Sequence, residues 1–283
     1  AGESHKTLDS VRALYDRFAD AELDRSGAVI ALGGGVITDM AGFAAATFMR
    51  GVPLVQVPTT LLSMADASIG GKVAVDHPKG KNLIGAFVRP LLVMLDPQTL
   101  PTLPAVELQA GLAEIVKAGI IADPALFEMF ERSTLPVDLH EAIERAIAVK
   151  LAIVEQDPYE TGRRAVLNLG HTFAHAFEVL AEYRLHHGLA VSMGIAAAAY
   201  LAESRGLCAT QTVERIIHTL RKHDLPVQYD AHSPDAVCQA MRTDKKRRGN
   251  KLRFVLPRAI GDVIVDADVP EEQVIAALER MHP

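Results

Sequence analysis

Tryptophan is absent from this sequence, and aromatic residues as a whole make up only 5% of it. Ala, Val, Leu and Ile abound instead, a balance that favours helices packed on a sheet over an all-β sandwich. Cysteine is scarce as well: Cys208 and Cys238 show neither metal-ligand spacing nor the density of a disulfide framework. We therefore expect a reduced, cytoplasmic protein.

The sequence also lacks a surplus of positive charge and any apolar run of transmembrane length. Its formal charge is −6 at pH 7, which argues against a nucleic-acid partner, and the basic run at 245–248 is too short to outweigh it. No signal-peptide pattern is found at the N-terminus, so we expect no membrane partner. With 283 residues, 49% of them apolar and 23% charged, a globular protein of one large or two modest domains is expected.

Hydrophobic periodicity divides the chain into two regions. The first third alternates helical patterns, over about 7–25 and 36–48, with short apolar runs typical of buried parallel strands at 28–32, 54–57 and 91–95. The stretch 69–87 predicts a hairpin or a long loop. Further helices are expected near 106–118, 124–132, 138–155, 171–182, 188–205, 209–223 and 271–281, with a late hairpin over 252–264.

This pattern predicts an α/β parallel-sheet nucleotide-binding domain over 1–100, followed by a mainly α-helical metal- and substrate-binding domain over 101–283. The boundary is expected near 98–103, where Pro97, Pro101 and Pro104 cluster.

Three consecutive glycines, Gly33 to Gly35, follow the first apolar run and precede a predicted helix. Backbone without Cβ atoms can approach a pyrophosphate, and the helix N-terminus offers N–H groups and the positive end of its dipole. A tight turn without a ligand explains the glycines alone equally well. The strand–glycine–helix–strand order predicts a parallel sheet with ligands at the carboxyl ends of its strands.

Histidines at 171 and 175 lie four residues apart on a predicted helix, so both imidazoles point the same way. This spacing recurs at metal sites, and Glu114 and His187 add two possible ligands. Catalytic zinc uses three protein ligands and keeps one position open. A satisfied core or surface histidine is the simpler interpretation of any one of them.

Cationic residues are spread over both halves of this net acidic chain. Asp66, Lys72, Lys81 and Asn82 lie among glycines, which suits backbone close to a ligand, although a solvated loop is the simpler interpretation. Lysines on rigid loops suit phosphate or carboxylate groups as compact point charges. Further candidates are Arg50, Lys117, Lys150, Arg164 and Lys245–Lys246, each of which by itself is best explained as a surface charge.

Taken together and in this order, these motifs resemble the 3-dehydroquinate synthases. The resemblance is carried by ALGGGVITD at 31–39, RG at 50–51, PTTLL at 58–62, GGK at 70–72, GKN at 80–82, EIVK at 114–117, NLGHTFAH at 168–175, HG at 187–188 and DKK at 244–246. It covers essentially the whole chain, and the motifs are specific as a set where each alone is weak.

The resemblance implies a role for each matching residue. It implies the ligands of Zn²⁺ (or Co²⁺) at Glu114, His171 and His187. The implied NAD contacts are Glu3, Lys6, Gly34, Gly35, Val36, Asp39, Thr59, Thr60, Lys81, Thr99 and Thr102. The implied substrate contacts are Arg50, Asp66, Lys72, Asn82, Lys117, Lys150, Arg164, Asn168, His171, His175, His187 and Lys246. Catalytic roles fall to His175 and Glu160 as proton acceptors and to Lys72, Arg164 and Asn168.

The implied activity is that of a lyase of the shikimate pathway of aromatic amino acid biosynthesis, converting 3-deoxy-D-arabino-heptulosonate 7-phosphate into 3-dehydroquinate and phosphate. In the family, NAD oxidises the C5 hydroxyl while the metal polarises that oxygen, and phosphate leaves by β-elimination. The hydride then returns, the ring opens and an aldol closure follows. A substrate with both carboxylate and phosphate accounts for the many lysines and arginines. A homodimer is also implied.

The sequence departs from the family in three places. Asp76 stands where many members have Asn, and Ala174 where Gly is common, but neither residue carries an assigned role. The segment 2–6 resembles a cofactor-contacting turn well inside the family's N-terminal domain, so we expect about two strands and their helix to be missing. If the polypeptide is whole, an exposed sheet edge, weaker NAD binding and reduced stability are expected.

Three other functions stay open from the sequence. Related sugar phosphate cyclases make valiolone or inosose products, but Lys150, Asn168, His175 and Lys246 together favour a dehydroquinate synthase. Metal-dependent polyol dehydrogenases share the glycine turn and the helical histidines, yet do not need the cationic cluster. An inactive binding or dimerisation module is the third alternative.

Overall fold

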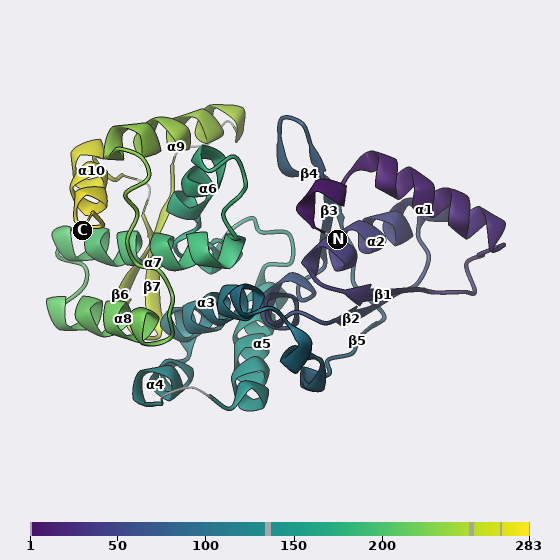
Figure 1. Cartoon of the computed structure of the whole chain (residues 1–283), viewed down its shortest axis with the longest axis horizontal. Coiled ribbons are helices and arrows are strands. Elements are labelled where there is room, and N and C mark those ends of the chain that lie inside the picture. Colours follow the sequence, from purple (N-terminus) through teal and green to yellow (C-terminus); the bar gives the residue numbers. More distant parts are fainter. Residues whose placement is uncertain (1, 134–136, 249–251, 267, 283) are drawn as a thin grey trace. The chain divides into compact units, whose positions relative to one another are not determined.

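The computed structural model describes residues 2–133, 137–248, 252–266 and 268–282, with the side chains of 243–248 outside the description. Two compact units make up the chain, Ala1–Pro104 and Ala105–Pro283. The parallel sheet lies in the first unit and most of the helices lie in the second (Figure 1). The predicted α/β and mainly helical fold class is therefore confirmed.

A three-stranded parallel sheet forms the base of the first unit. Its strands β1 (Val29–Gly33), β2 (Leu54–Pro58) and β5 (Leu92–Val93) lie in the order β1-β2-β5. The first pair runs in register from Val29 beside Leu54 to Gly33 beside Pro58. Because the strands are parallel, the turns that follow β1 and β2 leave the sheet at the same edge.

Only one face of this sheet is covered within the described residues. Helices α1 (Leu8–Asp20) and α2 (Gly35–Thr47) lie on that side (Figure 1). Val29 and Ala31 of β1 pack there, whereas Ile30 and Leu32 are 67% and 64% exposed. The prediction of a buried strand was therefore wrong for half of β1, since a continuous apolar run does not tell which faces are covered.

The stretch 69–87 forms an antiparallel hairpin, β3 (Lys72–His77) and β4 (Gly80–Phe87), which decides between the two predicted alternatives. Val73 and Val75 of β3 pack against Phe43 and Ala44 of α2. A short π-helix, Ser63–Ala67, precedes the hairpin. Helix α2 is thus held between the sheet and the hairpin, which fixes the turn at its N-terminus.

The second unit is built around α7 (His187–Ser204), which contacts α3, α6, α8, α10 and β6. The other helices are α3 (Ala105–Ala122), α4 (Pro124–Arg132), α5 (Leu139–Gln156), α6 (His171–Leu180), α8 (Thr210–Lys222), α9 (Pro234–Arg248) and α10 (Glu271–Glu279). The predicted late hairpin is β6 (Phe254–Ala259) and β7 (Asp262–Asp266). Phe127, Phe130, Phe173 and Phe177 are fully buried in the core.

Local sequence explains where several of these helices begin. Asp123 caps α4 by accepting the Leu126 N–H at 3.1 Å, with Pro124 in the first turn. Asp138 caps α5 in the same way through the His140 N–H at 3.0 Å. Helix α9 was missed by the sequence analysis because its polar and basic residues mask the few apolar ones that it buries.

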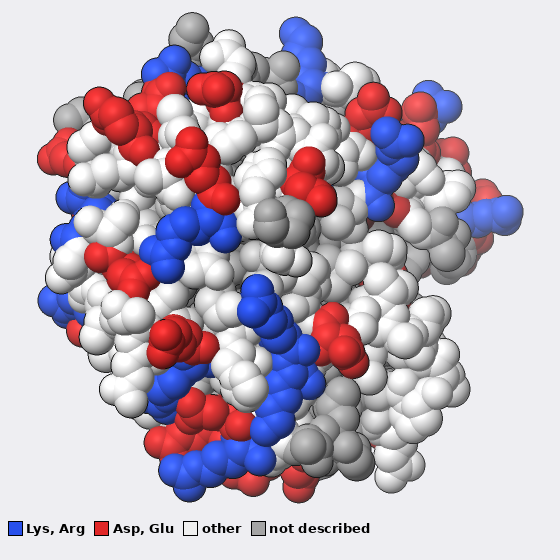
Figure 2. All heavy atoms as spheres, turned by 60° about the vertical axis from the view of Figure 1, so that its left-hand side comes forward, with Lys and Arg blue, Asp and Glu red and all other residues white. Residues whose placement is uncertain are grey.

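Charged side chains of both signs are interspersed on the face shown in Figure 2. Within the described residues, we find no helix with the length and apolar character needed to cross a membrane. Cys208 and Cys238 are both buried and free.

Candidate active site

Three helices of the second unit bring together one carboxylate and two imidazoles. Glu114 lies in the middle of α3, while His171 and His187 are the first residues of α6 and α7. Glu114 Oε1 lies 3.6 Å from His187 Nε2 and 4.0 Å from His171 Nε2. One ligand atom from each residue lies within 4.8 Å of the others. These are the three residues that the family resemblance implies as metal ligands, and we call them the Glu114 cluster.

Close helix packing creates this cluster. A Cβ at Gly188 would lie 2.0 Å from the Ala110 carbonyl oxygen, so the first turn of α7 rests directly on α3, one turn before Glu114. A Cβ at Gly170, where φ is +79°, would lie 2.7 Å from the Ile195 nitrogen of α7. Glycine is needed at both places because no other residue leaves room for the neighbouring backbone.

The Glu114 carboxylate fits a bound cation. The residue is 2% exposed, and apart from an ion pair between Oε2 and Lys117 neither oxygen has a hydrogen-bond partner among the described residues. A buried carboxylate with an open acceptor costs free energy unless a positive group meets it. One carboxylate and two imidazoles with an open position is a donor set of catalytic zinc.

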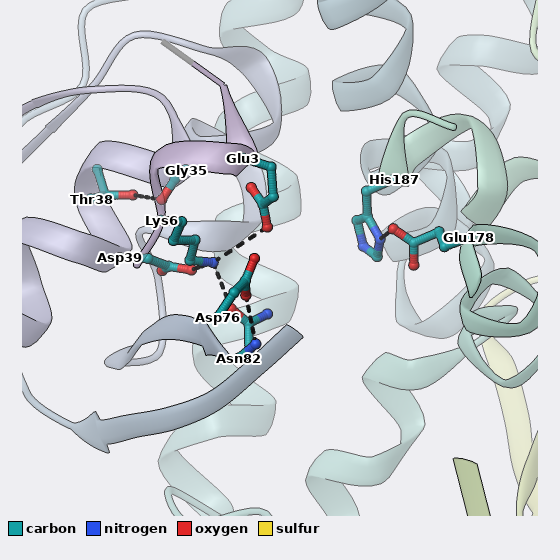
Figure 3. A network of polar contacts seen from close by, with 9 residues as sticks. All are labelled: Glu3, Lys6, Gly35, Thr38, Asp39, Asp76, Asn82, Glu178 and His187. Carbon is teal, nitrogen blue, oxygen red and sulfur yellow. Dashed lines mark hydrogen bonds and ion pairs between the residues drawn. The ribbon is translucent and has the colours of Figure 1, made fainter. Parts of the chain in front are cut away.

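Both histidines are held through Nδ1, which leaves Nε2 facing Glu114. His171 Nδ1 lies 3.2 Å from the Leu169 carbonyl oxygen, so it donates there. His187 Nδ1 lies 3.4 Å from Glu178 Oε1 (Figure 3). A ring whose Nδ1 carries the proton offers an Nε2 lone pair to a metal, and such outer partners fix tautomer and orientation.

The pKa values of the two histidines are shifted in opposite directions. Burial, with Lys117 and the neighbouring histidines, lowers the pKa of His171 well below its ordinary value, so its imidazole is neutral at pH 7. Burial also disfavours the charged form of His187, but the Glu178 and Glu114 carboxylates outweigh it and raise the pKa. The raised pKa reflects the negative charge around His187, which a bound cation would also compensate.

Glu178 was missed by the sequence analysis. It is 2% exposed and lies on α6, seven residues after His171 and three after His175. Residues at these spacings share one face of a helix. The combined pattern His–x3–His–x2–Glu would therefore have indicated it.

The segment between α5 and α6 holds three of the predicted catalytic residues. Asn168 Nδ2 donates to Glu160 Oε1 at 2.8 Å, and the buried Arg164 donates to the Pro158 carbonyl oxygen at 2.6 Å. Asp157, which the sequence analysis also missed, organises this segment. Its carboxylate accepts the backbone N–H groups of Arg164 and Thr161, both at 2.9 Å, and that of Gly162 at 2.8 Å. These bonds to Arg164 and Thr161, together with the one to Gly162, lower the pKa of Asp157 to about 2.

The remaining predicted residues of the second unit lie around these groups. The His175 ring centroid lies 5.6 Å from that of His171 and 6.4 Å from that of His187. Lys117 is buried beside Glu114, and Lys150 is buried on α5. The Lys246 side chain lies outside the described residues.

In the first unit, the glycine turn and the Thr59–Thr60 turn meet at one edge of the sheet. The Thr59 N–H donates to the Gly33 carbonyl oxygen at 2.9 Å, and α2 begins at Gly35. The predicted NAD contacts Gly34, Gly35, Val36, Thr59 and Thr60 therefore share the carboxyl edge of a parallel strand pair. That is where open α/β sheets bind ligands.

Beside this turn, five polar residues that we call the Lys6 network contact one another (Figure 3): Glu3, Lys6, Asp39, Asp76 and Asn82. Lys6 Nζ donates to Asp39 Oδ2 and to Asn82 Oδ1, both at 2.6 Å. Burial by itself would lower the pKa of Lys6, but Asp39, Glu3 and Asp76 outweigh it and raise the pKa. Lys6 is thus a buried ammonium group held by carboxylates.

Other predicted residues of the first unit occupy separate turns and strands. Arg50 is exposed at the end of a short 3-10 helix, and Asp66 lies on the π-helix after β2. Lys72 begins β3 and Lys81 lies on β4. The Thr99 and Thr102 hydroxyls donate to backbone oxygens of their own 3-10 helix, Pro97–Thr102, or of its N-cap, at 2.8 Å each.

Comparison with known families places both parts of the chain in one family. Residues 1–110 match the family described as 3-dehydroquinate synthase N-terminal, and residues 111–247 match 3-dehydroquinate synthase C-terminal. A 3-dehydroquinate synthase of Desulforamulus reducens is 47% identical over 288 residues, covering 99% of this chain and 80% of that protein.

Two solved structures are similar over nearly the whole chain. A 2-epi-5-epi-valiolone synthase from Streptomyces hygroscopicus subsp. jinggangensis, with NAD⁺ and Zn²⁺ bound, is 33% identical with a TM-score of 0.92, covering 99% of this chain and 81% of that one. A 2-deoxy-scyllo-inosose synthase in complex with carbaglucose-6-phosphate, NAD⁺ and Co²⁺ is 28% identical with a TM-score of 0.90 and the same coverage.

Proposed function

Because this chain belongs to the 3-dehydroquinate synthase family, we propose that it converts 3-deoxy-D-arabino-heptulosonate 7-phosphate into 3-dehydroquinate and phosphate, with NAD and a divalent metal. The observation that carries this proposal is the 47% identity to a 3-dehydroquinate synthase over 99% of the chain. The Glu114 cluster supplies independent support, since its donor set suits the metal that this chemistry needs.

The metal would be held by Glu114, His171 and His187. When bound, it supplies a Lewis acid that polarises a substrate oxygen. Glu178 and the Leu169 carbonyl oxygen hold the two imidazoles so that each Nε2 faces the ligand position. Lys117 contacts the Glu114 carboxylate and brings a cation for an anionic substrate to the same place.

The cofactor would bind at the glycine turn of the first unit. Gly34, Gly35 and Val36 present the N-terminus of α2, whose free N–H groups suit a pyrophosphate. Thr59 and Thr60 border the same edge of the sheet, and their hydroxyls extend this polar surface. Lys81 would add a positive charge to the same surface.

Proton transfer would fall to the residues between α5 and α6 and to His175. Asn168 holds the Glu160 carboxylate at 2.8 Å, so the carboxylate has a fixed orientation for accepting a proton. Arg164 is buried and fixed by Asp157 and Pro158, which suits it to a phosphate or carboxylate oxygen of the substrate. Arg50, Asp66, Lys72, Asn82, Lys150 and Lys246 complete the proposed substrate contacts.

The other sugar phosphate cyclases are the second candidate. They are favoured only by the similar solved structures, whose identities of 33% and 28% lie below the 47% to a dehydroquinate synthase. The proposal also includes a homodimer in the cytoplasm, and it is supported by the family resemblance alone. Sedimentation of the purified chain tests the dimer.

Phosphate release tests the function. Purified protein with NAD and Zn²⁺ is expected to release phosphate from 3-deoxy-D-arabino-heptulosonate 7-phosphate without net NADH production, because the hydride returns to the substrate. His171→Ala should abolish release, whereas His140→Ala, which replaces an exposed histidine of α5, should not. Release from sedoheptulose 7-phosphate instead would indicate a valiolone-type cyclase. Net NADH would indicate a dehydrogenase.

A further inference from the structure

The Lys6 ammonium makes two hydrogen bonds and one longer ion pair inside the first unit. It donates to Asp39 Oδ2 and Asn82 Oδ1 at 2.6 Å, and Glu3 Oε1 lies 3.8 Å from the same nitrogen (Figure 3). Lys6 is 3% exposed. An ammonium group has three donors and no acceptor, so two of the three donors of Lys6 are used within the first unit.

The backbone reinforces these contacts. The Asp76 N–H donates to the Lys6 carbonyl oxygen, and the Asn82 N–H donates to Asp76 Oδ1, both at 2.8 Å. Asn82 has a φ of +54°, a conformation that Asn and Asp adopt more readily than other residues with a side chain. Lys6 therefore fixes both ends of the β3–β4 turn region, through its side chain and its main chain.

This arrangement decides which way the Asn82 amide points. Lysine only donates hydrogen bonds, so Asn82 must face it with Oδ1, and the NH₂ group is directed elsewhere. Asn82 is exposed, so those two N–H donors are available to a ligand. Donors suit the carboxylate, phosphate or hydroxyl oxygens of a sugar acid phosphate.

The surroundings of the Lys6 ammonium consist of groups from the first unit. Three carboxylates, from Glu3, Asp39 and Asp76, lie around one ammonium group in the Lys6 network. Acceptors of the first unit therefore already surround the Lys6 ammonium.

We propose that Lys6 is a positioning residue that orients the Asn82 amide toward the substrate and holds the Asp39 carboxylate beside the cofactor turn. The inference rests on the proposed function, which assigns Asn82 to the substrate and Asp39 to NAD. This positioning role is separate from the NAD contact that the family resemblance implies for Lys6. It also gives Asp76 a role, since Asp76 fixes the backbone of both Lys6 and Asn82.

A double-mutant cycle separates positioning from direct contact. Lys6→Met keeps the length of the side chain without its charge, and Asn82→Gly removes the amide while accepting the positive φ. With NAD saturating, each change should raise the KM for the sugar phosphate about tenfold, the effect of losing a hydrogen bond to a charged group or ligand. The double variant should be no worse than Asn82→Gly.

A direct NAD contact predicts a different pattern. Lys6→Met would then raise the KM for NAD by the same factor in both backgrounds and leave the KM for the sugar phosphate unchanged, which would overturn the proposal. Asn82→Asp is the matched variant: it keeps the Lys6 contact and tolerates the positive φ, but replaces donors by an acceptor. It should fold like the parent and still raise the KM for the sugar phosphate.

A second measurement needs no activity and so separates failure of this inference from failure of the proposed function. The chain has three asparagines, and Asn168 and Asn250 belong to the second unit. In protein labelled with ¹⁵N-asparagine, Lys6→Met should shift the side-chain NH₂ signals of Asn82, identified by their loss in Asn82→Gly, and leave the other two pairs in place. An unmoved Asn82 signal would overturn the proposal whether or not the parent releases phosphate. Movement of all three pairs would show a general structural change and also count against it.

Discussion

The Lys6 network of the first unit and the Glu114 cluster of the second both bury charged side chains, but they differ in how far partners within the protein satisfy those charges. Lys6 donates to Asp39 and Asn82 and forms an ion pair with Glu3. In the Glu114 cluster, a 2% exposed carboxylate pairs with Lys117 through Oε2, while Oε1 has no hydrogen-bond partner among the described residues. The first arrangement is complete without a ligand, and the second is completed by one.

This difference teaches how a buried charge is to be interpreted. A charge whose partners are all internal stabilises and orients those partners, so its removal should affect folding and the geometry of its neighbours. A charge with open acceptors is costly to the folded state and is retained for binding. Its removal should therefore affect ligand affinity more than the folding of the metal-free protein.

The largest expected effect is that of Glu114→Gln on metal binding. The amide keeps the volume and can still accept from Lys117, but the negative charge is lost. Zn²⁺ affinity should fall more than about 100-fold, beyond the effect of losing an outer partner, while the metal-free free energy of unfolding should fall by about 1–3 kcal/mol, because the buried Lys117 loses its counter-charge. Competition with a chromogenic chelator measures the first and urea unfolding the second. Glu128→Gln, at a partly exposed position of α4, is the control.

Glu178→Gln should have the next largest effect. The variant keeps a hydrogen-bond acceptor near His187 Nδ1 but loses the carboxylate that orients the ring. A decrease in Zn²⁺ affinity of about 10- to 100-fold is expected, as for other outer partners of metal ligands. Glu182→Gln, a neighbouring exposed position, should bind like the parent. Equal Zn²⁺ affinity in the two variants would show that Glu178 does not orient a metal ligand.

Asp39→Asn tests the Lys6 network, where the expected effect is on stability. Loss of the charged bond to Lys6 should lower the free energy of unfolding by about 1–2 kcal/mol, whereas Asp16→Asn on the exposed face of α1 should not. The pKa of Lys6 is raised in the folded state, so its contribution is fully present below the ordinary value of 10.5 and is lost above it. The difference between parent and variant should therefore stay constant from about pH 6 to 9 and shrink as the pH rises through the folded pKa. A difference that changes already near neutral pH would contradict this.

Asp157→Asn should have the smallest effect and the opposite pH dependence. Asp157 has a pKa of about 2 in the folded protein, below its ordinary value of 3.8, because backbone N–H groups bond its ionised form. Its contribution is therefore present above about pH 4 and is lost as the pH falls toward 2. The urea midpoint of the variant should lie below that of the parent at pH 5 to 7, and the two should converge as the pH falls. A constant gap down to pH 3 would show that another group is responsible.

Most helices could be predicted because their pattern is local. Apolar residues recurring every three or four positions indicated α4 and α5 close to their true bounds, and the structure shows that Asp123 and Asp138 cap these helices. Helix α9 could not be predicted, since its sequence is mostly polar and only its packing in the second unit shows what it buries. The exposure of Ile30 and Leu32 also could not be predicted, because it depends on which elements cover the sheet.

The candidate site likewise has features that the sequence could predict and features that it could not. The sequence by itself determined the residue types and the order of motifs that place the chain in its family, including the paired histidines four positions apart and the glycine turn after β1. Only the tertiary structure decided which charges meet: Lys6 reaches Asp39 across 33 positions and Asn82 across 76. Glu114, His171 and His187 meet because Gly170 and Gly188 let three helices pack closely. Periodicity and caps act over a few residues and are written along the chain, whereas the partner of a buried charge depends on how distant elements pack.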